Sequence, residues 1–166
     1  MKRWGINVLA VLSGVLMAVA LRQPWWSLDL QFTGKSVVFP NIIVGPVIEI
    51  IGYRKTAQMT ILTYLLLACI VVCLVASLLR GRIGRLLLGV SGVLPMLAIW
   101  RFYSRIADVA ERFDMPVQGR GIANYSGFSP LEVTTKLESG IYLMAAGAVL
   151  CLLAAILHER VRLRLG

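Results

Sequence analysis

The sequence predicts an all-α membrane protein, a four-helix transmembrane bundle in up-down-up-down order with a small outer cap. We expect the cap to be a β-hairpin or sheet from the first long loop. Hydrophobic residues make up 58% of the 166 residues and charged residues 15%, whereas a soluble domain carries about 25% charged residues. Four apolar stretches approach the roughly 20 residues of a membrane helix. Basic residues gather at the ends of these stretches, as membrane anchors do.

The chain is short enough to be one domain, and its elements follow in order. The predicted spans are residues 4–21, 56–79, 86–103 and 139–157, with outer loops at 22–55 and 104–138. The first span resembles a signal peptide, but we expect it to stay uncleaved because no small-x-small exit site follows it. The third contains Pro95, which neighbouring helices can accommodate. We expect its helix to continue past Arg101 as an amphipathic extension to about Asp114.

Loop charges predict the orientation. The short segments 1–3, 80–85 and 158–166 carry eight basic residues against one acid, whereas the rest of the chain carries nine against seven. Dense Lys and Arg in short loops marks the cytoplasmic side. We therefore predict a protein of the plasma membrane with both termini on its cytoplasmic side. The tight turn 80–85 makes spans two and three an antiparallel hairpin.

The first outer loop predicts a hairpin and an apolar segment. Residues 27–32 alternate polar and apolar, 33–35 supply a turn, and 36–39 are β-branched and aromatic, which is typical of a hairpin. Trp25 and Trp26 are expected at headgroup level as belt residues, the alternative being a ligand contact.

The rest of that loop, residues 40–53, is almost wholly apolar and could lie on the interface, dip into the membrane or cover the hairpin. Glu49 lies within it. A buried Glu49 would be functional or paired with Arg54 or Lys55, whereas an interfacial one would face water. The candidates for interaction surfaces in the outer loops are Trp25, Trp26, Phe39, Ile43, Glu49, Tyr53 and Tyr125.

The second outer loop predicts an exposed, irregular stretch followed by a helix. Residues 119–129 are rich in Gly, Asn and Ser and indicate a surface loop. Asn124 begins an Asn-Tyr-Ser triplet and is a possible glycosylation site. Ser129 followed by Pro130 and Glu132 is typical of a helix N-terminus.

The sequence indicates no catalytic, cofactor or metal site. Cys69, Cys73 and Cys151 lie inside apolar runs, which favours a role as small apolar packing groups and excludes a loop disulfide framework. Ser13 and the other span hydroxyls are expected to pack helices together. His158 is the only histidine, so a haem or zinc ligand set is not expected. The sequence has no basic stripe of the kind that binds nucleic acid, so a nucleic-acid partner is not expected.

The order of elements resembles the claudin-like tetraspan group, which includes the peripheral myelin protein relatives. In claudins the first span also ends in a Pro-x-Trp stretch that leads into two strands, and Pro24, Trp25 and Trp26, followed by 28–30 and 37–39, occupy that place. The claudin Trp-Gly-Leu-Trp stretch and paired loop cysteines are absent. The resemblance implies a four-helix bundle capped by an outer sheet, and it does not extend to a tight-junction role.

The function predicted from these observations is that of a non-catalytic membrane structural or interaction protein. It would act through its outer loops and helix faces, in contact with the lipid bilayer, as a homo-oligomer or bound to a larger membrane partner. Two alternatives stay open. One is an accessory subunit of a multi-subunit membrane enzyme such as a respiratory complex, and the other is a small channel or transporter.

Overall fold

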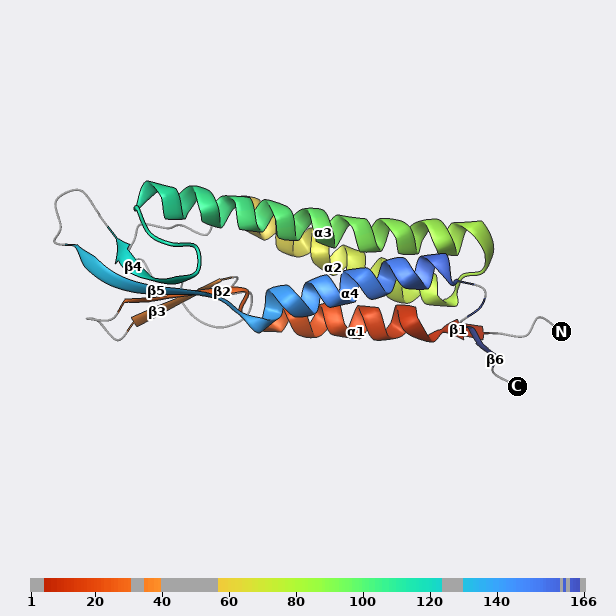
Figure 1. The fold of residues 1–166 in the computed structure, drawn as a ribbon. Coiled ribbons are helices and arrows are strands. Elements are labelled where there is room, and N and C mark those ends of the chain that lie inside the picture. The colour runs from red at the N-terminus through yellow and green to blue at the C-terminus, as the bar shows by residue number, and fades with distance from the viewer. Residues whose placement is uncertain are drawn as a thin grey trace.

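The computed structural model describes residues 5–30, 35–39, 57–123, 130–158, 160 and 162–164. Within them, four helices form an elongated bundle, and a small sheet extends from one end of it (Figure 1). The helices are α1 (Val8–Arg22), α2 (Ala57–Leu78), α3 (Gly81–Arg112) and α4 (Ser139–Ile156). Packing is ring-like, because α1 lies against α2 and α4, and α3 also lies against α2 and α4.

Helices α2, α3 and α4 are long and apolar enough to cross a membrane, whereas α1 is a shorter apolar helix. The helix α1 begins at Val8, whereas the predicted first span begins at residue 4. Asn7 accepts a hydrogen bond from the Ala10 amide through its side chain, at 3.2 Å, and so caps the helix. Strand β1 (Gly5–Asn7) precedes the cap. The 15 residues of α1 therefore span about 22 Å as helix.

Helix α3 is the longest element, with 32 residues or about 48 Å. It begins five residues before the predicted span and passes through Pro95 without ending. Its predicted extension beyond residue 103 is confirmed, since the helix ends at Arg112. Buried residues recur every three or four positions from Gly84 to Ala110, so one face of α3 is covered along nearly its whole length.

The cap is a four-stranded antiparallel sheet with strand order β3-β2-β5-β4. Its strands are β2 (Trp26–Leu30), β3 (Lys35–Phe39), β4 (Gly119–Ala123) and β5 (Leu131–Leu137). The β2–β3 pair confirms the predicted hairpin in the first loop.

Two predictions for the second loop are wrong. Residues 119–123 are a strand rather than irregular loop, and the residues after Pro130 are β5 rather than a helix. Val133, Thr134 and Thr135 are β-branched, and β5 pairs on both sides, with β2 and with β4. Tertiary pairing of such residues overrides the local Ser-Pro capping signal.

A second, two-stranded ladder lies at the opposite end of the bundle. Strand β1 pairs antiparallel with β6 (Arg162–Arg164), so that Gly5 lies opposite Arg164 and Asn7 opposite Arg162. The ladder brings the two ends of the chain together, on the far side of the bundle from the cap (Figure 1). The bundle is thus closed by backbone pairing at both ends.

Gly140 holds the start of α4 against the chain that leaves α1. Its amide donates to the carbonyl of Pro24 at 2.8 Å. A Cβ at this position would lie 2.6 Å from the Pro24 carbonyl oxygen and 2.7 Å from that of Gln23. Both are backbone atoms, so the contact cannot be relieved by a side-chain rotation.

Gly140→Ala is therefore expected to destabilise the fold by about 1–3 kcal/mol, the usual range for overpacking. Thermal unfolding in detergent, followed by tryptophan fluorescence, measures it. Gly89→Ala is the matched control, because a Cβ there meets nothing within 4 Å and an alanine in a helix is favoured by about 0.5–1 kcal/mol. Equal unfolding temperatures for the two variants would contradict this packing.

Candidate functional site

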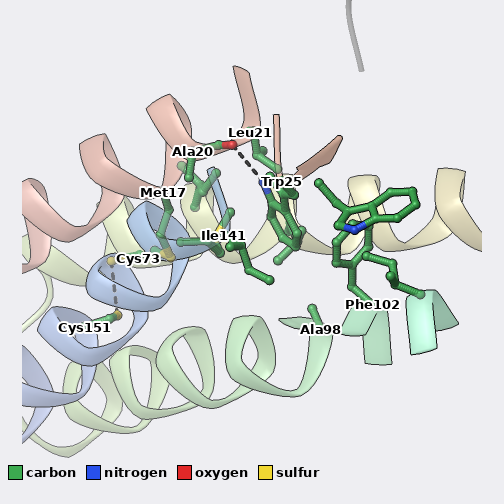
Figure 2. Packing of buried hydrophobic residues seen from close by; sticks show 14 of the residues in the cluster. Met17, Ala20, Leu21, Trp25, Cys73, Ala98, Phe102, Ile141 and Cys151 are labelled. Carbon is green, nitrogen blue, oxygen red and sulfur yellow. Dashed lines mark hydrogen bonds between the residues drawn. The ribbon is translucent and has the colours of Figure 1, made fainter. Parts of the chain in front are cut away.

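Trp25 lies at the junction between bundle and cap, and only 1% of its surface is exposed. Its indole Nε1 donates to the Ala20 carbonyl at the end of α1, at 2.9 Å. Its ring meets Phe102 of α3 edge-to-face, with centroids 5.1 Å apart and planes at 82° (Figure 2). This geometry is the favoured one for an aromatic pair. Trp25 thus joins the first helix to the third.

Trp26 continues the junction into the sheet. It is 3% exposed, and its Nε1 donates to the Val117 carbonyl at 3.0 Å, which ties β2 to the segment after α3. Trp25 and Trp26 are therefore buried in the fold, and the prediction that they are exposed residues of an aromatic belt or of an interaction surface is wrong. Both indoles find buried carbonyl acceptors, which makes their burial in the core favourable.

The sheet has one packed and one polar face. Leu28, Val133 and Thr135 are buried, and the Thr135 hydroxyl donates to the Pro116 carbonyl at 2.9 Å. The register puts alternate residues of β2, β4 and β5 on the opposite side. We call this the outer face of the cap, and its exposed members are Asp29, Arg120, Ile122, Glu132 and Lys136.

The outer face of the cap carries both charge signs. Lys136 forms an ion pair with Glu138 at 3.5 Å, and Glu138 accepts a hydrogen bond of 2.8 Å from the Ser27 hydroxyl. An exposed ion pair of this kind contributes little to stability. Charged groups on such a surface instead determine which partners fit it.

The sides of the bundle present apolar surface. Large exposed side chains occur on all four helices, including Leu12, Val71, Val93 and Leu153. Among the residues that the structure describes, the large exposed aromatic side chains lie in the half of the bundle nearer the cap. They are Tyr64, Trp100, Tyr103 and Tyr142.

Polar side chains meet in the middle of the bundle. The Ser13 hydroxyl of α1 donates to the Gly147 carbonyl of α4 at 2.7 Å. The Cys73 thiol of α2 donates to the Ala10 carbonyl at 3.3 Å, and the Cys151 thiol of α4 donates to the Leu88 carbonyl of α3, also at 3.3 Å. These three side chains link all four helices, consistent with the packing role expected for the span hydroxyls and thiols.

A second polar contact lies where β1 enters the bundle. The Asn7 amide donates to the Ala154 carbonyl at 3.1 Å and lies 3.3 Å from His158 Nδ1. Because the Asn7 oxygen caps α1, its nitrogen faces His158, and an amide nitrogen can only donate. The Asn7 amide therefore links β1 to the end of α4 and to the His158 ring. Asn7 carried no sequence signal beyond its position before an apolar run.

Of the other residues predicted to form interaction surfaces, only Phe39 lies among the residues that the structure describes. Phe39 pairs through its backbone with Trp26 at the end of β3. Ile43, Glu49, Tyr53, Asn124 and Tyr125 lie outside the described residues. Among the described residues, no group of three or more His, Cys, Asp or Glu side chains could hold a metal ion.

Comparisons with protein-family models, curated proteins and solved structures return no significant match.

Asn7→Ala is expected to lower stability by about 1–3 kcal/mol, because it removes a helix cap and leaves the Ala154 carbonyl without its side-chain donor. The loss is read from the unfolding temperature in detergent. Val8→Ala, one residue along and exposed, is the control and should change it little. An Asn7→Ala variant as stable as the control would show that the cap contributes nothing.

Proposed function

We propose that this chain is an integral membrane protein that crosses the bilayer four times and acts, without catalysis, as a structural or interaction protein. The observation that carries the proposal is the division of its surface. The sides of the helices expose apolar residues, whereas the outer face of the cap exposes charged ones. Helices with apolar sides can contact the lipid of a bilayer. The charged outer face of the cap would then lie outside the lipid, where it can bind another protein.

Spacing along α3 supports the membrane placement. Arg82, at the turn between α2 and α3, and Arg101, beside Trp100, are both exposed. They are separated by 19 residues of helix, or about 28 Å, close to the roughly 30 Å of a bilayer's hydrocarbon core. Arginine and aromatic side chains are the residues that anchor helices at such boundaries.

Helix α1 is shorter than the hydrocarbon core of a bilayer, but β1 and α1 together are long enough to cross it. Its helix covers about 22 Å, and the three residues of β1 add about 10 Å. A strand at membrane depth must have its backbone groups paired, and β6 supplies the pairing. The same end carries Arg80, Arg82 and Arg85, so it is the proposed cytoplasmic side, with the cap outside the plasma membrane.

The interior supports a structural rather than a chemical role. Ser13, Cys73, Cys151 and Asn7 each donate to a backbone carbonyl of a neighbouring helix. These side chains hold the bundle together. The surfaces left for a partner are the helix sides and the outer face of the cap, for self-association or for contact with a larger membrane protein.

Thiol labelling of intact cells tests the orientation. A cysteine placed at Arg120, on the cap, should react with a membrane-impermeant maleimide, whereas one placed at Arg82 should react only after permeabilisation. Native background should be low because Cys69, Cys73 and Cys151 are all buried. The opposite pattern would reverse the proposed topology.

Native mass measurement after mild-detergent extraction tests the interaction role. A homo-oligomer, or a complex with a larger membrane protein, is expected, and a double charge reversal of Arg120→Glu with Lys136→Glu should shift the population toward the free chain. Arg112→Glu, exposed at the end of α3, is the matched control and should leave the mass unchanged. A free wild-type chain would overturn the proposal, and stoichiometric chains carrying a redox cofactor would replace it with the accessory-subunit alternative.

A further inference from the structure

Two thiols touch across the centre of the bundle. The sulfurs of Cys73 on α2 and Cys151 on α4 are 3.3 Å apart, and both side chains have 0% exposure (Figure 2). Since α1 and α3 each pack between α2 and α4, this contact bridges two helices that face each other across the middle. We propose that Cys73 and Cys151 are a redox-active pair that closes to a disulfide and locks the bundle. This goes beyond the interaction role and does not depend on it.

The geometry is close to that of a disulfide. The S–S bond length is about 2.05 Å, so the sulfurs must approach by about 1.3 Å, a movement on the scale of small side-chain rotations. Closing the bond removes two thiol donors, to the carbonyls of Ala10 and Leu88. Thiols are weak donors, so little is lost. The Ser13 hydroxyl, 3.8 Å from the Cys73 sulfur, keeps its own bond to Gly147.

Polar contacts lead from the end of the bundle to the pair. His158 lies at the end of α4 against Asn7, Asn7 binds the Ala10 amide, and the Ala10 carbonyl accepts from Cys73. Cys151 is also one helical turn from Ala154, whose carbonyl binds Asn7. The thiol pair is therefore the inner end of a column of polar groups.

The oxidant class that fits is a hydroperoxide. Full burial excludes a bulky disulfide such as glutathione, whereas hydrogen peroxide is small and uncharged. One thiol attacks the peroxide, so that an S–O bond forms, the O–O bond breaks and water leaves. The second thiol attacks that sulfur, the S–S bond forms, and a second water carries away the remaining oxygen. Together the two thiols lose two electrons, and one hydrogen peroxide is reduced to two water molecules.

Cys69 provides an internal comparison. It is buried on the same helix, one turn from Cys73, whereas the Cys73 thiol makes its hydrogen bonds with Cys151, Ser13 and Ala10. It should stay a free thiol under conditions that close the Cys73–Cys151 bond. The disulfide would close a covalent loop from Cys73 to Cys151 that contains α3, β4 and β5, which restricts the unfolded chain.

The experiment treats the purified full chain in liposomes with hydrogen peroxide, then unfolds it and measures intact mass before and after thiol alkylation. The expected result is a loss of two hydrogens, one alkylated cysteine instead of three, and a cross-linked peptide pair containing Cys73 and Cys151. Dithiothreitol should restore three alkylated cysteines. The oxidised chain should also unfold at a temperature several degrees higher.

Variants identify the cysteines. Cys69→Ser should still lose two hydrogens, whereas Cys73→Ser and Cys151→Ser should not. The decisive measurement, the mass of the peroxide-treated chain, is made on the wild-type protein. A variant that fails to fold therefore does not affect the test. Three alkylated cysteines after peroxide treatment, or a cross-link that includes Cys69, would overturn the proposal and leave the pair as a packing contact.

Discussion

The indole of Trp25 contacts the end of α1 through Ala20, the side of α3 through Phe102 and the start of α4 at Gly140. Its own carbonyl accepts from the Glu138 amide at 2.9 Å. The next residue, Trp26, begins β2 and lies opposite Leu137 at the end of β5. Trp25 and Trp26 therefore join the end of the bundle to the paired strands β2 and β5. A ring with a large apolar body and one polar atom can do this only where a carbonyl is within reach.

Parts of this fold follow from the sequence because they depend on local patterns. Helices α2, α3 and α4 are apolar over membrane length, and the β2–β3 hairpin has alternation and a turn within about a dozen residues. The extension of α3 was also predictable, since its buried residues keep helical spacing up to Ala110.

Other parts depend on partners far away in the chain. Strand β5 exists because β2 lies beside it, about a hundred residues earlier, and no window around Pro130 contains that information. The length of α1 depends on Asn7 and on β6. Trp25 and Trp26 have the composition of an interfacial pair, and only their acceptors at Ala20 and Val117 show that they are core residues. The contact of Cys73 with Cys151 likewise requires the packing of four helices.

The ladder of β1 with β6 has a consequence for the order of events during synthesis. The two strands are separated by nearly the whole described chain, since Gly5 pairs with Arg164. As the chain leaves the ribosome, β1 must wait for α2, α3, the cap and α4 before its partner exists. Closing so distant a contact is slow compared with forming a hairpin. Until then the backbone N–H and C=O groups of β1 lack their strand partner, so this end of the bundle is the last part of the fold to close.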